Sequence, residues 1–310
     1  MKVLVTGGCG FVGSNLVDLL MERGHSVTVL DNLSNGGRDN IKAHLKSKNF
    51  RFIKGDILGR KAEDALSGVD AVAHEAAIIS VPFSIKKPEL THKINVDGTR
   101  HLLEASADAG VKRFVYASSC AVYGDQKKMP ISEDAPLRPL SPYAESKLAA
   151  EKSCIGFYKR QGLSTVCLRY FNIYGPRQSG GEYAGVMIKF MERLKNNEPP
   201  IIYGDGKQTR DFVYVGDVAE ATLLALECET KGGEVVNIGT GRGASINQLC
   251  DIFLTLTGNK GMKPFRWTPR EGDIRHSRAD ISKARRLLGF RPKVGLKDGV
   301  KKLLESYGGW

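Results

Sequence analysis

The sequence predicts an α/β protein with a doubly wound parallel sheet and a second, smaller α/β lobe. Three observations support this prediction. Short apolar runs of strand length alternate with helical patterns through the first half of the chain. A glycine-rich stretch separates the first strand from the first helix. The 310 residues also exceed what one hydrophobic core usually supports, so we expect two lobes.

The first 31 residues read as a dinucleotide-binding unit. A strand, a glycine-rich turn, a helix and a second strand follow in order at residues 2–6, 7–13, 11–23 and 27–30. The glycines allow backbone N–H groups and the positive helix N-terminus to approach a pyrophosphate, and an acid after the second strand accepts from a ribose hydroxyl. The residues expected at the cofactor are Gly7, Gly10, Phe11, Val12, Gly13 and Asp31.

The cofactor expected from this unit is NAD. A carboxylate at Asp31 would repel the 2′-phosphate of NADP, although Arg38 is close enough in sequence to leave NADP open. The spacing Gly7-x-x-Gly10-x-x-Gly13 departs from the G-x-G-x-x-G pattern.

Composition excludes several other classes of protein. No apolar run reaches the length of a membrane span, and Met1 begins directly in a strand, so we expect a cytoplasmic protein. The six cysteines form no CxxC or Cys/His cluster, which predicts reduced thiols and no metal site. The net charge of +12 is scattered without a basic and aromatic platform, so we expect anionic small molecules and not nucleic acid as partners.

The ends of later strands carry further candidates. Residues 50–57 alternate like a strand that ends on Asp56, which could accept from the adenine amino group or cap a helix. Small residues follow the strand expected at 69–74 and leave room for a cofactor beside the backbone. Ser118 and Ser119 follow the strand expected at 112–117, although hydroxyl residues are also common turn formers.

Tyr143 and Lys147 lie four residues apart at the start of a predicted helix, one turn from each other on one face. A free tyrosine, with a pKa near ~10, is a poor base at neutral pH. A nearby ammonium and the positive nicotinamide ring would favour the phenolate. A Tyr-x-x-x-Lys pair alone is also typical of a solvated helix face. Combined with the dinucleotide unit and a serine at a strand end, it indicates a proton-transfer site.

The second half of the chain predicts a separate lobe. Residues 182–194 form a predicted helix that leaves the first lobe, and residues 235–238 form a strand that returns to it. We therefore expect a dinucleotide lobe over residues 1–171, completed near 211–250, and an interleaved substrate lobe over 172–310. Arg210 and Arg270 could together clamp a diphosphate, although each alone could equally form a surface salt bridge.

These motifs together resemble the extended short-chain dehydrogenase/reductases, and within them most closely the UDP-hexose 4-epimerases of the UDP-galactose 4-epimerase type. The family motifs are Thr6-Gly7-Gly8-Cys9-Gly10-Phe11-Val12-Gly13, Ser118-Ser119, Tyr143-x-x-x-Lys147 and Arg169-Tyr170-Phe171-Asn172. The epimerase-like stretches are Asp31 to Asn35, Val122-Tyr123-Gly124, Gly206-x-Gln208-x-Arg210-Asp211 and Arg270-Glu271-Gly272-Asp273. The resemblance covers nearly the whole chain.

The resemblance implies a Rossmann fold and a defined reaction. Tyr143 would take the proton of the sugar 4-hydroxyl while C4 gives hydride to NAD, with Ser119 positioning that oxygen and Lys147 holding the nicotinamide ribose. The 4-keto sugar would then turn over and take hydride back on its other face. Further implied cofactor contacts are Asn32, Asn35, Gly36, Asp56, Ile57, Ala76, Ala77, Asn95, Ser118 and Tyr170. Implied substrate contacts are Ser80, Val81, Ser119, Tyr143, Asn172, Arg210, Arg270, Asp273, Ser277 and, on uracil, Tyr203.

Several alternatives stay open within this resemblance. Cys120 and Ala121 occupy the positions where the 4,6-dehydratases carry Asp-Glu, which disfavours dehydratases and the similar UDP-glucuronate decarboxylases. Reductases of the family usually use NADPH, which Asp31 disfavours. A dinucleotide-sensing regulator without catalysis is the alternative from another class, and the intact catalytic residues argue against it.

The preferred sugar is a separate question. The small Ser277 suggests room for UDP-GlcNAc and UDP-GalNAc besides UDP-Glc and UDP-Gal, and Ser80-Val81-Pro82 is similar to the members that accept N-acetylhexosamines. UDP-glucuronate is a further option because of the excess positive charge. The family also implies a homodimer through helices at 90–109 and 142–161, whose apolar residues could equally be buried on the sheet.

Overall fold

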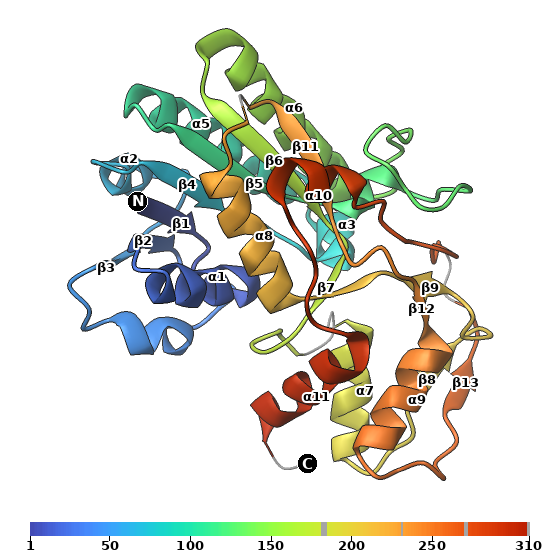
Figure 1. Cartoon of the computed structure of the whole chain (residues 1–310). Helices are drawn as coiled ribbons and strands as arrows, with labels where there is room; N and C mark the ends of the chain where they lie inside the picture. The colour runs from blue at the N-terminus through green and yellow to red at the C-terminus, as the bar shows by residue number, and fades with distance from the viewer. Residues whose placement is uncertain (181–184, 231, 270–271, 309–310) are drawn as a thin grey trace.

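The computed structural model describes residues 1–180, 185–230, 232–269 and 272–308. Its first lobe is built on a seven-stranded parallel sheet with the order β11-β6-β5-β4-β1-β2-β3 (Figure 1). The strands are β1 (Lys2–Thr6), β2 (Ser26–Asp31), β3 (Phe50–Lys54), β4 (Ala71–His74), β5 (Arg113–Ser119), β6 (Ser164–Tyr170) and β11 (Glu234–Ile238). The strand order reverses between β1 and β4, which opens a crevice for ligands at the carboxyl ends of the strands.

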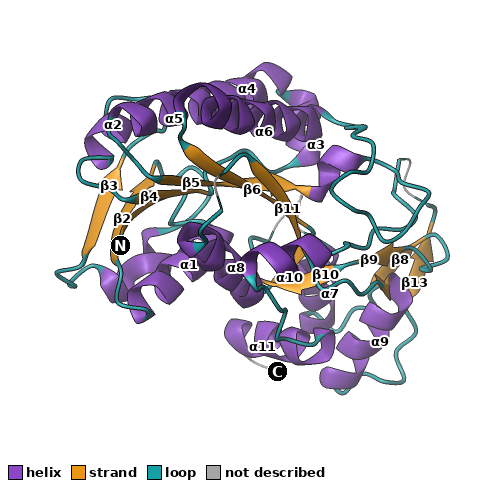
Figure 2. Cartoon of the chain, turned by 45° about the horizontal axis from the view of Figure 1, so that its top comes forward, coloured by secondary structure: helices purple, strands orange, loops and turns teal. Residues whose placement is uncertain are grey.

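Helices cover both faces of this sheet, as Figure 2 shows. One face carries α1 (Phe11–Glu22), α8 (Val215–Glu227) and α10 (Ser282–Leu288). The other carries α2 (Lys61–Ala65), α3 (Val81–Lys86), α4 (Pro88–His92), α5 (Gly98–Asp108) and α6 (Pro142–Gln161). Successive side chains of β1 therefore enter different apolar cores: Val3 and Val5 pack on the α1 side, and Leu4 packs on the α5 and α6 side.

Three short helical turns complete the first lobe. The 3₁₀ helices η1 (Arg38–His44) and η3 (Cys120–Tyr123) follow β2 and β5, and the π-helical turn η2 (Lys93–Asp97) joins α4 to α5. The helix expected at 90–109 is thus present as α4, η2 and α5, with a π turn in its middle. The strand predicted over 50–57 ends earlier, at Lys54, because the Asp56 carboxylate accepts the backbone N–H of Leu58 in a turn.

The second lobe has its own core between α7 (Val186–Lys195), α9 (Ile246–Leu256) and α11 (Leu296–Tyr307). Its short strands pair as β7 (Asn172–Tyr174) with β10 (Phe212–Tyr214), β8 (Ile201–Tyr203) with β13 (Phe265–Trp267), and β9 (Thr209–Arg210) with β12 (Ala244–Ser245). The helix predicted over 182–194 begins at Val186, since the preceding Gly185 has an extended backbone; residues 182–184 lie outside the described residues. The chain re-enters the first lobe at α8 and β11, so the lobes interleave (Figure 1).

Three further features concern the thiols, the helices and possible metal ligands. All six cysteines are free thiols. Within the described ranges, no helix is both long enough and apolar enough to cross a bilayer. The same residues include no group of three or more His, Cys, Asp or Glu side chains placed to hold a metal ion.

A buried ion pair ties the sheet to α6. Arg169 on β6 donates from Nε and Nη2 to the two carboxylate oxygens of Glu151 on α6, at 2.9 and 2.8 Å. The same guanidinium donates to the Tyr123 hydroxyl, which in turn donates to Asn237 on β11. The two charged side chains are only 4% and 2% exposed. Neither charge has water to replace its partner, so each depends on the other.

We predict that Arg169→Met destabilises the protein by about 3–5 kcal/mol, because it leaves the Glu151 carboxylate buried without its partner. The measurement is urea unfolding followed by circular dichroism. The control is Lys301→Ala, which removes an exposed pair with Glu305 and is expected to cost less than ~1 kcal/mol. Equal midpoints for the two variants would contradict the prediction.

Candidate active site

The glycine-rich turn after β1 is packed too closely to hold side chains. Gly7 has φ +67°, and a Cβ added there would lie 2.7 Å from the backbone nitrogen of Ala76 at the end of β4. A Cβ on Gly13 would lie 2.2 Å from the Gly7 carbonyl oxygen, so α1 touches the turn directly. Gly10 is the N-cap of α1, and no side chain caps this helix end. The open N–H groups of α1 therefore point into the crevice between β1 and β4, where they suit an anion.

The Asp31 carboxylate lies beside this turn. It accepts the backbone N–H of Cys9 at 2.9 Å and that of Leu33 at 2.8 Å, which anchors the end of β2 to the turn. Asn32 donates to Asp56 at 2.9 Å, which brings the end of β3 into the same group. A Cβ on Gly36 would lie 2.5 Å from the Cys9 carbonyl, so the loop that follows β2 also packs on the turn. Residues from three strand ends thus converge on one side of the crevice.

The predicted catalytic residues meet on the other side of the crevice. Ser119 is the last residue of β5, while Tyr143 and Lys147 lie in the first two turns of α6. The Ser119 hydroxyl lies close enough to the Tyr143 phenol to lower its pKa as a hydrogen-bond donor, and its oxygen accepts the backbone N–H of Ala121 at 3.1 Å. Lys147 donates from Nζ to the Ala117 carbonyl of β5 at 2.7 Å, and its Nζ lies 5.0 Å from the centre of the Tyr116 ring. The fold therefore brings together a phenol, a hydroxyl and an ammonium group from two elements.

Burial works against both charged forms at this site. It raises the pKa of Tyr143 to about 12, against a smaller lowering by the hydrogen bond from Ser119. It lowers the pKa of Lys147 to about 8, and the carboxylates of Glu75 and Glu151 oppose that change. The sequence analysis expected the Lys147 charge to lower the Tyr143 pKa. The pKa is raised instead, because desolvation has the larger effect. A further positive charge beside the phenol would be needed to make it a base at neutral pH.

A cavity of about 370 Å³ opens between the two lobes beside Ser119. Four of the predicted substrate residues line it: Ser119, Asn172, Arg210 and Ser277. Ser277 is 7% exposed, and its hydroxyl lies beside the Cys120 thiol. The cavity wall also contains residues that the sequence analysis did not single out, namely Tyr174, Gln178, Val186, Met187, Phe212 and Ile274. Most of these are apolar, so the cavity offers contact surface with few fixed charges.

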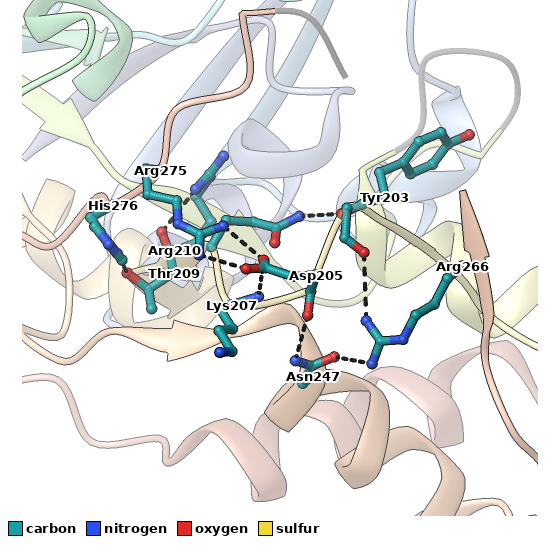
Figure 3. A network of polar contacts seen from close by, with 11 residues as sticks. Tyr203, Asp205, Lys207, Thr209, Arg210, Asn247, Arg266, Arg275 and His276 are labelled. Carbon is teal, nitrogen blue, oxygen red and sulfur yellow. Dashed lines mark hydrogen bonds and ion pairs between the residues drawn. The ribbon is translucent and has the colours of Figure 1, made fainter. Parts of the chain in front are cut away.

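Arg210 belongs to a polar network at the second-lobe side of this cavity (Figure 3). Its Nη2 donates to Asp273 at 2.5 Å, and its Nη1 donates to the backbone carbonyl of Thr209. Gln208 donates to the backbone carbonyl of Tyr203 at 2.9 Å, which fixes the end of β8. Arg270 lies outside the described residues. Arg210 and Asp273 are thus brought together, and Tyr203 lies in the same network.

Comparison with known proteins identifies the family. The model of the NAD dependent epimerase/dehydratase family matches residues 3–239, most of the chain. This chain belongs to the NAD dependent epimerase/dehydratase family. The resemblance to the extended short-chain dehydrogenase/reductases is thereby confirmed, as is the α/β fold with its parallel sheet.

Three relatives show how far the similarity extends. A putative UDP-glucose 4-epimerase of Methanocaldococcus jannaschii is 41% identical over 305 residues, which is 97% of each chain. The structure of UDP-N-acetylglucosamine 4-epimerase from Methanobrevibacter ruminantium M1, in complex with UDP-N-acetylmuramic acid, matches with a TM-score of 0.94 at 36% identity, covering 99% of this chain and 97% of that one. UDP-glucose 4-epimerase from Thermotoga maritima, with UDP-glucose, matches with a TM-score of 0.92 at 41% identity, covering 99% and 98%.

The cofactor of this family member is NAD, and the crevice fits it. The close packing at Gly7 and Gly13 leaves only backbone at the turn, and the uncapped N-terminus of α1 suits a pyrophosphate. The Asp31 carboxylate stands at the end of β2, the position that recognises an adenosine ribose. Arg38, the residue that left NADP open, stacks at 5.6 Å over the Phe52 ring.

Three of the residues predicted to contact the cofactor use their side chains within the protein. The Asn95 amide pairs with both the N–H and the carbonyl of Ile78, at 2.8 and 2.9 Å, and also donates to Ser146 on α6. Ser118 donates to Glu151, and Tyr170 donates to Glu75. Asn95 therefore holds the loop after β4 against the catalytic helix, at the π turn η2. A direct contact of these three with NAD stays a prediction.

The remaining predicted residues make helix-cap, backbone or packing contacts around the crevice. The Ser80 hydroxyl caps α3 by accepting the Phe83 N–H, and the adjacent Val81 is exposed. Ala76 donates its N–H to the Thr6 hydroxyl at 3.3 Å, which keeps the loop that continues into Ala77 close to β1. The others are placed by packing: Ile57 is buried against Gly98, and the Asn35 carbonyl lies near Gly10.

Glu75 is the polar residue of this crevice that the sequence analysis missed. It directly follows the buried strand β4, much as Asp31 ends β2. The same signal, an acid immediately after a buried apolar run, could have identified it.

We predict that Gly13→Ala lowers the affinity for NAD at least tenfold, because the new Cβ would collide with the Gly7 carbonyl and displace the turn from α1. Titration of the cofactor-stripped protein by calorimetry measures this. The matched control is Gly261→Ala, where nothing lies within 4 Å of an added Cβ. If Gly13→Ala binds NAD as tightly as the control does, the pyrophosphate-binding site is not at this turn.

Proposed function

We propose that this protein is a UDP-hexose 4-epimerase that interconverts UDP-Glc with UDP-Gal and also accepts UDP-GlcNAc and UDP-GalNAc. The observation that supports the proposal is the pairing of the Tyr143 phenol on α6 with Ser119, which lines the inter-lobe cavity. This arrangement puts a hydroxyl at the edge of a space of sugar size, with an acid–base group as its neighbour. The relatives named for UDP-glucose and UDP-N-acetylglucosamine 4-epimerase support the same reaction class.

Each catalytic side chain has a role that follows from its position. Tyr143 takes the proton from the sugar 4-hydroxyl and later returns it to the same oxygen, so no proton is lost over a cycle. Ser119 donates to that oxygen and aligns it with the phenol. Lys147, held on the Ala117 carbonyl, supplies positive charge next to Tyr143. NAD supplies the acceptor and donor of the C4 hydride.

An epimerase must also let the sugar present both faces of C4, and the cavity supports this. The diphosphate and uridine are held at the second lobe, where Arg210, Asp273 and Tyr203 lie together. The hexose is then enclosed mainly by aromatic and aliphatic side chains. Such walls make few directional bonds, so the oxidised sugar can turn over without leaving.

Two alternatives are less well supported by the cavity. Among the described lining residues Arg210 is the one cation, and it pairs with Asp273, so the carboxylate of a UDP-glucuronate would lose hydration without a cation of its own. A dehydratase needs a second acid–base group beside Ser119. Burial raises the pKa of the Cys120 thiol to about 12, and Ala121 has no titratable group. A 4-reductase or a dinucleotide-sensing regulator would show no 4-epimer product.

We also infer a homodimer. The segment from α4 to α5 and the helix α6 form the outer layer on one face of the sheet (Figure 2). Leu90 on α4 is 42% exposed there, and a second copy could cover it. Sedimentation would test this proposal. The cytosolic location expected from the sequence stays a prediction.

The test of the function is turnover by the purified protein, without added NAD, of UDP-Glc, UDP-GlcNAc and UDP-GlcA in separate reactions. We expect the 4-epimers of the first two, resolved by NMR, because the cavity favours neutral hexoses. Tyr143→Phe is expected to lose at least ~10³-fold in kcat, since it removes the proton acceptor. A 4-keto-6-deoxy product, or turnover that requires NADPH, would replace the epimerase with a dehydratase or a reductase.

We predict that Ser277→Tyr lowers kcat/KM for UDP-GlcNAc at least tenfold more than for UDP-Glc. Ser277 is almost fully buried at the cavity wall, and a phenol ring there would occupy the space that an N-acetyl group needs. Ser277→Ala is the control for loss of the hydroxyl alone and is expected to keep the ratio of the two substrates. An equal loss for both substrates in Ser277→Tyr would place the N-acetyl group elsewhere.

A further inference from the structure

Glu75 lies at the point where the sheet reverses its strand order. It directly follows β4, and its backbone N–H donates to the Thr6 carbonyl at the end of β1, at 3.2 Å. A Cβ on Gly7 would lie 3.0 Å from the Glu75 carbonyl carbon, so the residue abuts the glycine-rich turn. A dinucleotide that crosses the sheet between β1 and β4 must therefore pass over Glu75.

The order of the strand ends shows which half of the dinucleotide this is. Along the carboxyl edge, Asp31 ends β2, Glu75 follows β4, Ser119 ends β5 and Tyr170 ends β6. Asp31 lies on the adenosine side of the turn, whereas Ser119 marks the site of hydride transfer. The Glu75 carboxyl reaches past the end of β5 to Tyr170, so it lies on the nicotinamide side.

The contacts of Glu75 occupy one of its carboxylate oxygens. Oε1 accepts the Tyr170 hydroxyl at 2.9 Å, and that hydroxyl lies 2.8 Å from the Thr222 hydroxyl of α8. Thr222 donates to the Val218 carbonyl at 2.9 Å, which anchors this chain of hydroxyls in the helix. Within the described part of the chain, no hydrogen bond reaches Oε2. Lys147 on α6 is the nearby positive group, and its charge interacts with that of Glu75.

We propose that the Glu75 carboxylate is the counter-charge of the oxidised nicotinamide ring and makes the site bind NAD⁺ in preference to NADH. Hydride transfer from sugar C4 changes the ring from a charge of +1 to neutral, while the hydroxyl proton passes to Tyr143. A fixed negative charge in a poorly solvated site stabilises the first state and not the second. The ring is thereby driven to return its hydride, so the oxidised sugar is reduced again before it leaves.

The charge of Glu75 depends on the groups that face it from each neighbouring element. These are Lys147 from α6 and Tyr170 from β6; Thr222 from α8 does not titrate, and His74 on β4 is neutral because burial lowers its pKa to about 3. Burial raises the pKa of Glu75 to about 7, against opposing effects of Tyr170 and Lys147. The carboxylate is therefore present above that pH and is lost below it, and the preference for NAD⁺ should follow.

The test is the ratio of the dissociation constants of NAD⁺ and NADH for the cofactor-stripped protein, measured by calorimetry at about pH 8 and about pH 6. For the native chain we expect a lower ratio, hence a stronger preference for NAD⁺, at the higher pH. Glu75→Gln should raise the ratio at the higher pH by about tenfold and weaken its pH dependence, leaving only the part that comes from Lys147, whose pKa is about 8. Glu75→Asp, which keeps the charge, should preserve the preference.

Thr222→Val is the matched control, because it removes the far hydroxyl of the chain and leaves the carboxylate in place. It is expected to keep the native ratio at both pH values. If Glu75→Gln leaves the ratio unchanged, or if it weakens NAD⁺ and NADH equally, the proposal is overturned and Glu75 only supports Tyr170. The measurement uses no sugar, so its outcome is independent of whether the proposed epimerase substrates are right.

Discussion

The contact on which the site depends is that between Gly13 at the start of α1 and the Gly7 carbonyl after β1. A Cβ on Gly13 would lie 2.2 Å from that oxygen, so the helix reaches the sheet only because a side chain is absent. This approach brings the N–H groups at the start of α1 to the carboxyl edge of the sheet. It also sets the place of Asp31, which bonds to the Cys9 N–H within the same turn. The shape of the dinucleotide-binding site is thus a consequence of backbone packing.

Charge within the first lobe is arranged in pairs that compensate the loss of water. Glu151 is shared between Arg169 and the hydroxyl of Ser118, next to Ser119, the residue proposed to position the sugar oxygen. Lys147 retains part of its basicity because Glu75 and Glu151 oppose the effect of burial. The Lys147 ammonium is therefore stabilised from two sides, by Glu151 in its pair with Arg169 and by Glu75 at the crevice. Loss of either carboxylate would change the charge available to Tyr143.

The two lobes contribute different groups to the site, and this difference matches the proposed reaction. The groups proposed to move protons lie in the first lobe, on two rigid elements, the end of β5 and the start of α6. The second lobe supplies the guanidinium of Arg210 and the cavity wall around Phe212 and Met187. Anchoring the diphosphate on one lobe while the sugar contacts apolar side chains separates tight binding from rotation. An enzyme that oxidises and reduces one carbon from opposite faces needs that separation.

The sequence by itself determined the parallel sheet and the NAD unit and predicted the proton-transfer residues, because these depend on local signals. Apolar runs of strand length, glycines at 7, 10 and 13, and the Tyr143 and Lys147 spacing can all be read without knowing any long-range contact. Tertiary structure alone decided what each polar side chain bonds to. Asn95 holds the Ile78 backbone, Glu75 reaches Tyr170, and Ser277 meets the Cys120 thiol, each across elements distant in sequence. Burial likewise decided that the Tyr143 pKa rises, since desolvation depends on how the whole chain packs around the phenol.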